Sequence, residues 1–258
     1  MIIDLHVHHT LGPEPRTDFA AMRRLKGLAK QVGINRVCLL GNVFRFGIRA
    51  NDSQIRLIND STLELVRADG DFLSGFCFLN PALGSGFLRG EIRRCAREGL
   101  CGIKLEIDVN ARDRRLAPIM NTAADLNLPV LHHAWYKSQD KYRHESDPSD
   151  IACLGRRFPD TTIIMAHLVA AGVRGVLDIA DCPNVSVDTS GSQPVAGMVE
   201  YAVAKLGAGR VVFGSDACGR DFSCQLGKVL GARLSSSDRE KILHGNAERL
   251  LALTGALA

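Results

Sequence analysis

The chain has 258 residues, of which 46% are hydrophobic and 23% are charged, and its formal net charge is +4. This composition is ordinary for a soluble globular protein, and a chain of this length can bury a large core without disulfide staples. Basic residues are dispersed and aromatic residues make up only 5%, so neither charge nor stacking groups favour a nucleic-acid partner.

The N-terminus and the cysteines both favour a cytoplasmic protein. The chain starts on a strand-like run, Met1-Ile2-Ile3-Asp4-Leu5, without the charged and apolar regions of a signal peptide. None of the 8 cysteines forms a C-x-x-C pair, and some, such as Cys38, lie in apolar runs typical of buried reduced thiols. No apolar run approaches the roughly 18 residues of a transmembrane helix, so no membrane partner is expected.

Short apolar runs alternate with longer amphipathic segments from end to end. Most of the short runs are aliphatic or β-branched throughout, which is typical of parallel strands buried on both faces. The strands are predicted at Ile2–Val7, Arg36–Leu40, Phe72–Leu79, Gly102–Ile107, Pro129–His133, Thr162–Ala166, Asn184–Asp188 and Arg210–Gly214.

Helical patterns fill the gaps between these strands. The first runs from a cap at Asp18 to a stop at Gly33. Apolar positions indicate four more helices, one containing Leu57 to Val66, one marked by Ile92 and Cys95, one by Ile119 to Leu126 and one by Val173 to Ala180. Three further helices are expected over Pro148–Phe158, Val195–Leu206 and Asp238–Leu253. Eight strand–helix units without a compositional break predict an α/β fold, a single-domain (β/α)₈ TIM barrel over residues 1–258. A doubly wound open sheet is the alternative, but the glycine-rich phosphate turn G-x-G-x-x-G is missing.

In a barrel, function is built at the carboxyl ends of the strands. The first strand ends in His6-Val7-His8, and a spacing of two turns both imidazoles to the same side. Further strands end in Lys104-Leu105-Glu106, His132-His133, His167 and Asp216.

Imidazole and carboxylate ligands suit a divalent metal, with zinc favoured and manganese, iron or nickel as alternatives. Five of the chain's 8 histidines lie at these strand ends, a coincidence that favours a metal site over isolated polar residues. Three others are expected not to be ligands: His9, His144 and His244.

Trp135 either lines the pocket or anchors a loop on the rim of the barrel. The loop residues Arg45, Arg49 and Arg220 are candidates for binding an anionic group of a substrate.

The motifs in this order resemble the amidohydrolase superfamily. They are Asp-x-His-x-His on the first strand, His133 and His167 on the fifth and sixth, and Gly214-Ser215-Asp216 on the eighth. The chain resembles most the amidohydrolase-related branch of metal-dependent TIM-barrel hydrolases, through Gly102-Ile103-Lys104-Leu105 and Gly245-Asn246-Ala247. The resemblance covers essentially the whole chain.

The resemblance implies that His6, His8, His133 and Asp216 bind a metal. It places His167 beside that metal, as a ligand of a second ion or a substrate contact, and makes Asp216 the general base toward an activated water. Many members of this branch have histidine where this chain has Glu106. A carboxylate there can bridge two metals, with His133 and His167 on the second ion, or it can simply pair with Lys104 or an arginine. Glu106 favours the two-metal interpretation.

The expected function is metal-dependent hydrolysis of an amide, ester or lactone bond in a small molecule. One alternative is non-oxidative decarboxylation of a small aromatic or unsaturated acid, against which Glu106 speaks because the decarboxylases of this branch use one metal. Another is phosphoester cleavage, because Asp4 to Thr10 also resembles the polymerase-and-histidinol-phosphatase family. A non-catalytic barrel is disfavoured by the complete set of ligand positions. Homo-oligomerisation is left open.

Overall fold

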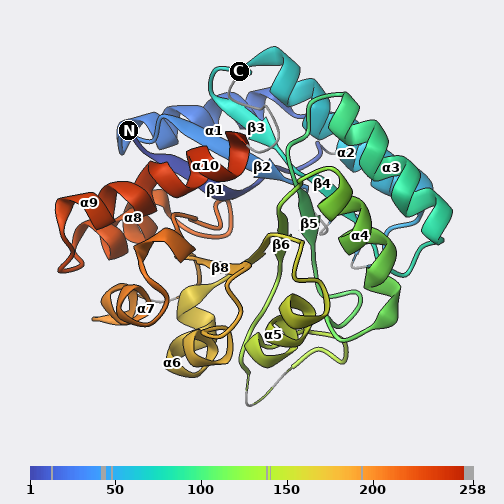
Figure 1. The fold of residues 1–258 in the computed structure, drawn as a ribbon. Coiled ribbons are helices and arrows are strands. Elements are labelled where there is room, and N and C mark those ends of the chain that lie inside the picture. The colour runs from blue at the N-terminus through green and yellow to red at the C-terminus, as the bar shows by residue number, and fades with distance from the viewer. Residues whose placement is uncertain are drawn as a thin grey trace.

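The computed structural model describes residues 1–12, 14–41, 45–47, 49–137, 139, 141–192 and 194–252, with the backbone alone at 169. Strands and helices alternate along the chain, and the helices lie outside the strands (Figure 1). The strands are β1 (Ile3–His8), β2 (Arg36–Leu40), β3 (Leu73–Gly75), β4 (Cys77–Leu79), β5 (Ile103–Leu105), β6 (Val130–His132), β7 (Ile163–Met165), β8 (Val185–Asp188) and β9 (Val211–Val212). The helices are α1 (Phe19–Gln31), α2 (Asp52–Ala68), α3 (Ser85–Arg97), α4 (Ala117–Asp125), α5 (Pro148–Arg157), α6 (Leu168–Asp178), α7 (Met198–Leu206), α8 (Phe222–Leu230), α9 (Ser236–Glu240) and α10 (Asn246–Ala252).

All strand pairs are parallel, in the orders β1-β2-β3 and β4-β5-β6-β7-β8-β9. Two sets of backbone hydrogen bonds join these sheets. The predicted third strand is interrupted only at Phe76, whose N–H donates to Leu39 O at 2.9 Å, so β3 and β4 are its two halves. At the other junction Leu5 N donates to Phe213 O at 3.0 Å. The strands therefore follow one another around a TIM barrel, which confirms the predicted fold class.

The predicted strands are confirmed to within two residues at their ends, and the first seven predicted helices are present. Helices α2, α3 and α6 begin five to seven residues before the first residue that indicated them. Asp18 caps α1 as expected, by accepting from Ala21 N at 2.8 Å, and Gly33 follows the helix with a φ of 84°. Both ends therefore follow from local side-chain chemistry.

The prediction was wrong at the C-terminal end of the chain. Helix α8, capped by Asp221, was not predicted, and the single helix expected from Asp238 to Leu253 is divided. A π-helical turn over Lys241–Gly245 separates α9 from α10, and there Ile242 O accepts from Phe213 N at 2.9 Å. Leu253 lies outside the described residues. A carbonyl directed toward a strand is a tertiary contact that helical periodicity does not encode.

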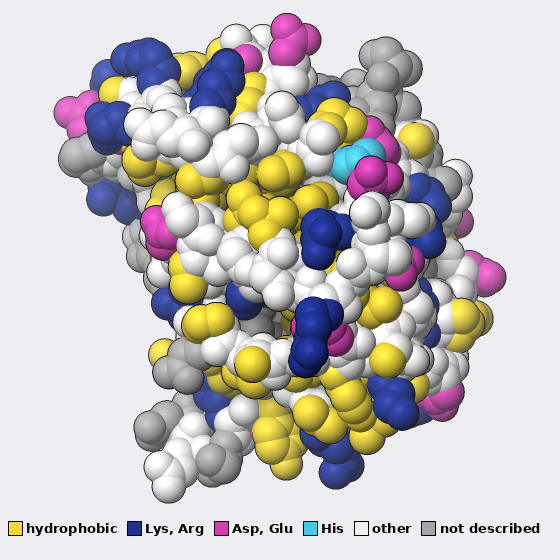
Figure 2. All heavy atoms as spheres, turned by 90° about the vertical axis from the view of Figure 1, so that its left-hand side faces the viewer, with side chains coloured by type: hydrophobic (Ala, Val, Ile, Leu, Met, Phe, Trp, Pro, Cys, Tyr) yellow, Lys and Arg dark blue, Asp and Glu magenta, His cyan; other side chains and the backbone are white. Residues whose placement is uncertain are grey.

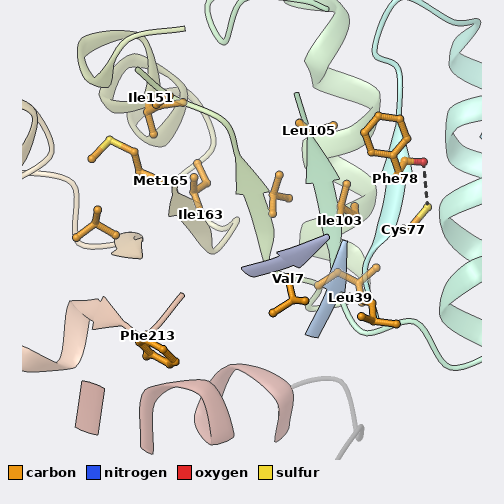
Figure 3. Packing of buried hydrophobic residues seen from close by; sticks show 14 of the residues in the cluster. Val7, Leu39, Cys77, Phe78, Ile103, Leu105, Ile151, Ile163, Met165 and Phe213 are labelled. Atoms are coloured by element: carbon orange, nitrogen blue, oxygen red, sulfur yellow. Dashed lines mark hydrogen bonds between the residues drawn. The ribbon is translucent and has the colours of Figure 1, made fainter. Parts of the chain in front are cut away.

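The core lies on both faces of the strands. Figure 3 shows strand residues such as Ile163 and Met165 beside Ile151 of α5, within the larger apolar cluster. Leu131 and Ile164, the alternate residues on neighbouring strands, belong to a second cluster. Two buried faces explain why the strand sequences are apolar throughout rather than alternating.

Basic, acidic and hydrophobic side chains are interspersed on the face formed by α7, α8 and α9 (Figure 2). No helix in the described part of the chain is long and apolar enough to span a membrane.

Candidate metal centre

The structure brings the six predicted site residues together at the carboxyl ends of the strands. His6 and His8 of β1 approach each other at 3.2 Å between their Nε2 atoms, and each lies 3.6 Å from Asp216 Oδ1. The imidazole of His167 lies beside that of His6, with 5.1 Å between ring centroids. Its Nε2 is 3.3 Å from Nδ1 of His133, the residue that follows β6.

Glu106 completes this row, because its Oε2 is 3.6 Å from Nδ1 of His133. The row thus runs from Asp216 and His8 through His6, His167 and His133 to Glu106.

The spacing of His6, His8 and Asp216 fits one divalent cation. Zinc binds imidazole nitrogen and carboxylate oxygen at about 2.0–2.2 Å, and tetrahedral geometry then separates two ligand atoms by roughly 3.3–3.5 Å. The three donor atoms are 3.2, 3.6 and 3.6 Å apart. Within the described residues this trio is one of two groups whose donor atoms lie close enough together to hold a metal ion.

The second such group, His6, His167 and Asp188, is better explained by hydrogen bonds. Asp188 Oδ2 lies 2.7 Å from His6 Nδ1. Because a carboxylate only accepts, the proton is on Nδ1, and Nε2 of His6 is free to bind a metal. Asp188 Oδ1 accepts from Ser190 Oγ, which therefore accepts from Nδ1 of His167 at 2.8 Å. Asp188 thus fixes the tautomers of both imidazoles.

The remaining two imidazoles are oriented in the same way. The carbonyl of Gly41 accepts from Nδ1 of His8 at 3.2 Å, and Glu145 Oε1 accepts from Nε2 of His133 at 3.0 Å. Each of the four histidines therefore turns an unprotonated nitrogen inward, the arrangement that outer carboxylates and carbonyls impose on metal-binding histidines. The donor set fits a metal ion.

Backbone conformation also marks the site. His167 and Asp216 have φ values of 71° and 64°, in the left-handed region that side chains other than glycine rarely adopt. They account for two of the three such non-glycine residues in the described part of the chain, the third being Asn127. Residues held in this region are concentrated at functional sites, where the surrounding structure compensates for the strain.

Glu106 makes the ion pair that was the alternative to a bridging role. Its Oε1 lies 2.9 Å from Nζ of Lys104, a fully buried lysine two residues earlier on β5. Burial raises the pKa of Glu106, but Lys104, His133 and His8 outweigh it and bring the pKa down to about 2. Glu106 is thus ionised and carries one oxygen, Oε2, on the side of His133.

Burial and mutual repulsion keep much of the imidazole row neutral. Burial, followed by the charge of His6, lowers the pKa of His8 to about 3. Burial and the charge of His133 lower the pKa of His167 well below its usual value. His6 differs, because Asp188 outweighs the effect of burial and raises its pKa. Neutral imidazoles are the form that binds metals.

The pKa of Asp216 is raised, whereas a carboxylate held at a cation would have a depressed pKa. Burial raises the pKa of this carboxyl, His6 and Lys104 oppose the rise, and the charges of Asp188 and Glu106 add to it. Burial and the nearby carboxylates thus make ionisation of Asp216 less favourable, and a bound divalent ion would act in the opposite direction.

Sequence reasoning missed Asp188, Ser190 and Glu145. Asp188 ends a predicted strand and could have been found by the rule used for the other strand ends. Glu145 lies in the loop between β6 and α5, 12 residues from its partner His133, and no local pattern indicates that contact.

His132 lies outside the row of imidazoles, and its Nδ1 donates to the carbonyl of His133 at 2.7 Å. His9 instead contacts Thr62 Oγ1 at 2.8 Å through Nε2. Trp135 lies against the site, with its ring centroid 5.5 Å from that of His167. This position favours the prediction that Trp135 lines the pocket over the alternative that it anchors a loop on the rim.

A sequence model of the family described as Amidohydrolase matches residues 3–253. The protein belongs to the amidohydrolase family. A comparison with curated proteins gave no match.

Solved structures with a similar fold include several enzymes of low sequence identity. The 5-carboxyvanillate decarboxylase from Sphingomonas paucimobilis is 15% identical with a TM-score of 0.78, over 97% of this chain and 98% of that one. A manganese-bound dihydroxybenzoic acid decarboxylase from a Polaromonas species is 18% identical with a TM-score of 0.73, over 98% and 97%. The 4-oxalomesaconate hydratase from Rhodopseudomonas palustris is 15% identical with a TM-score of 0.72, over 100% and 98%. At these identities the likeness establishes the fold.

Proposed function

We propose that this amidohydrolase-family protein is a metal-dependent hydrolase of an amide, ester or lactone bond in a small molecule. The observation that carries the proposal is the set of four oriented imidazoles beside Asp216. Each turns an unprotonated nitrogen inward because its other nitrogen is held by Asp188, Ser190, Gly41 or Glu145.

We assign His6, His8 and Asp216 to a first ion, and we infer that Glu106 bridges this ion to a second one on His133 and His167. The donor atoms of this second set lie further apart than those of the first trio. Zinc is the favoured metal, and manganese, present in one relative, is an alternative. A divalent ion held by these residues would lower the pKa of a water molecule and polarise a carbonyl group. Asp216, whose Oδ1 lies 3.6 Å from both imidazoles of β1, takes the proton of the attacking water as general base and returns it to the leaving group. His167 contacts the substrate or shares in this proton transfer.

Decarboxylation is a second candidate, and one contact favours it. The ion pair between Lys104 and Glu106 engages the oxygen that a bridging carboxylate would need, which favours a site with a single metal. Two of the structurally similar proteins above are decarboxylases, and we propose the same activity for this chain as the alternative. In this case Asp216 would transfer a proton to the carbon that loses the carboxylate.

Metal analysis and isotope labelling together test the proposal. The wild-type protein should bind zinc or manganese, and a His6→Ala/His8→Ala variant should lose the first ion while its circular dichroism remains native. Substrates found by screening small esters, lactones, amides and aromatic acids are then turned over in H₂¹⁸O. Incorporation of ¹⁸O into the product supports hydrolysis, whereas release of CO₂ without it supports decarboxylation. Full metal occupancy in the double variant would contradict the assignment.

A further inference from the structure

A cavity of about 370 Å³ lies beside α2, where the helix faces the loop that joins β1 to α1. On the side of α2 it is lined by Leu57, Asp60, Ser61 and Glu64, whose spacing places all four on one face of the helix. Ser61 is the smallest of the four and lies in the middle of this face, so its larger neighbours surround a hollow above it. None of the described residues that line the cavity belongs to the row of imidazoles and carboxylates.

The hydroxyl of Ser61 is buried without a hydrogen-bond partner. The residue is 2% exposed, and its Oγ has no partner in the described part of the chain. The next residue, Thr62, shows how the helix satisfies such a group, because its Oγ1 donates to Ile58 O at 3.0 Å and accepts from His9 Nε2 at 2.8 Å. A buried hydroxyl without a partner costs free energy. Since Ser61 forms the floor of a cavity, its missing partner is a group that enters this cavity.

Two carboxylates make the cavity acidic. Asp60 and Glu64 are four residues apart on α2, so their Cβ atoms lie roughly 5–6 Å from each other and their like charges repel. Glu64 Oε2 accepts from Thr17 Oγ1, and Asp60 Oδ1 accepts from Arg94 at 2.7 Å. The second oxygen of each carboxylate has no hydrogen-bond partner among the described residues. A cation between the two carboxylates would remove their repulsion, so the cavity fits a positively charged ligand.

The other walls favour an organic cation over a metal ion. Neither group of described residues whose donor atoms could hold a metal includes these two carboxylates. Leu57 and Phe19, the first residue of α1, add apolar walls, and Phe19 is 41% exposed. The face of an aromatic ring attracts a cation. Arg16, the basic residue of the described lining, pairs instead with Glu14 at 3.2 Å, so it leaves the charge of the carboxylates in place.

We propose that this cavity is a binding site for a small primary amine with an apolar body. A primary ammonium group carries three N–H donors, and the cavity offers three acceptors on Asp60, Ser61 and Glu64. The apolar body then lies against Leu57 and Phe19. The volume of about 370 Å³ has room for a molecule of roughly ten non-hydrogen atoms. The site is separate from the metal centre, so the inference does not depend on the proposed function.

The stability of two variants tests the role of Ser61 without a ligand. Ser61→Ala removes a hydroxyl that has no partner, and we expect the Tm to stay the same or to rise. The matched variant Thr62→Val removes a hydroxyl that makes two hydrogen bonds, and its Tm should fall by about 2–8 °C. A fall in the Tm of Ser61→Ala as large as that of Thr62→Val would show that Ser61 is satisfied within the fold, and would overturn the proposal.

Binding tests the ligand class directly, with benzylamine, a cation at neutral pH, and uncharged benzyl alcohol as probes in NMR titrations of the metal-loaded protein. The wild-type protein should bind benzylamine at least about 10-fold more tightly than the alcohol, because hydrogen bonds to a charged group are the stronger ones. Glu64→Gln and Asp60→Asn should each weaken benzylamine binding by about 5-fold or more. Asp125→Asn, at an exposed position of α4 outside the cavity, should leave it unchanged.

Three results of these titrations would overturn the proposal: no saturable binding of benzylamine, equal affinities for the two probes, or an affinity for benzylamine that survives in both Glu64→Gln and Asp60→Asn. Neither the titrations nor the Tm measurements involve turnover, so an absence of hydrolysis would count against the proposed function alone.

Discussion

Asp188 Oδ2 lies 2.7 Å from Nδ1 of His6, and both side chains are fully buried. Through this contact a carboxylate at the end of β8 sets the tautomer of an imidazole on β1. The same carboxylate accepts from the backbone N–H of His167 at 3.0 Å and, through Ser190, orients the ring of His167. One residue therefore prepares two of the proposed metal ligands.

Replacing Asp188 with asparagine should weaken metal binding without abolishing it. Asparagine can still accept from Nδ1 of His6, but it lacks the charge that makes the imidazole a better donor. Residues in this position typically contribute 10–100-fold in metal affinity. Competition with a chelator measures the Kd for zinc, and Asp113→Asn, at a partly exposed position, is the control. Equal affinities in the two variants would mean that Asp188 has no part in the metal site.

The role of Glu106 determines whether the site holds one metal ion or two. If Glu106 bridges, the metal-replete wild-type protein binds two ions, the second more weakly because Lys104 competes for Oε1 at 2.9 Å. Glu106→Gln should then bind one ion, and Lys104→Met should strengthen the second site. Calorimetric titration with elemental analysis gives the stoichiometry. One ion in the wild-type protein, with unchanged affinity in Glu106→Gln, would leave Glu106 as an ion-pair partner of Lys104 only.

Asp216→Asn should keep most of the volume of the side chain but remove the proposed base. We expect kcat to fall by a factor on the order of 10² to 10⁴, the usual contribution of a positioned general base. Measuring the metal content of the same sample separates loss of the base from loss of the ion. If the variant retains its metal and turns over at nearly the normal rate across the pH range, the base lies elsewhere, and His167 is the next residue to test.

Asp4 predicts a pH dependence of stability in the metal-free protein. Burial raises its pKa to about 7, although Ser215 and the N–H of His6 oppose the rise. Between about pH 4 and 7 the native state thus holds a proton that the unfolded chain releases, so the free energy of unfolding falls as pH rises through this window. The shift corresponds to a contribution on the order of 4 kcal/mol.

Asp4→Asn should remove this dependence while its amide oxygen still accepts from His6 N and Ser215 N, which both lie at 3.0 Å from Oδ1. Urea unfolding in the presence of a chelator at pH 5 and pH 8 measures the effect. The wild-type protein should lose more stability than the variant between these two values. Parallel losses in both proteins would show that Asp4 is ionised in the native state throughout this range.

The sequence by itself determined the barrel and most of the residues at its catalytic end. Strand and helix periodicity is local, because each side chain's burial follows from its position along its own element. The parity of His6 and His8 on β1, the cap at Asp18 and the stop at Gly33 could therefore be predicted without any knowledge of the neighbouring strands. The position of Asp216 and His167 at strand ends followed from the same pattern.

Only the tertiary structure decided which groups meet across strands. The pairing of Asp188 with His6 spans 182 residues, and that of Glu145 with His133 joins a loop to a strand end, so neither leaves a periodic trace in the sequence. The ion pair of Glu106 depends on the position of the ammonium group of Lys104, which is buried. The break between α9 and α10 depends on a hydrogen bond from Phe213 N. These features depend on strand register and packing, which bring together residues that are distant in sequence, whereas local patterns specify only the elements themselves.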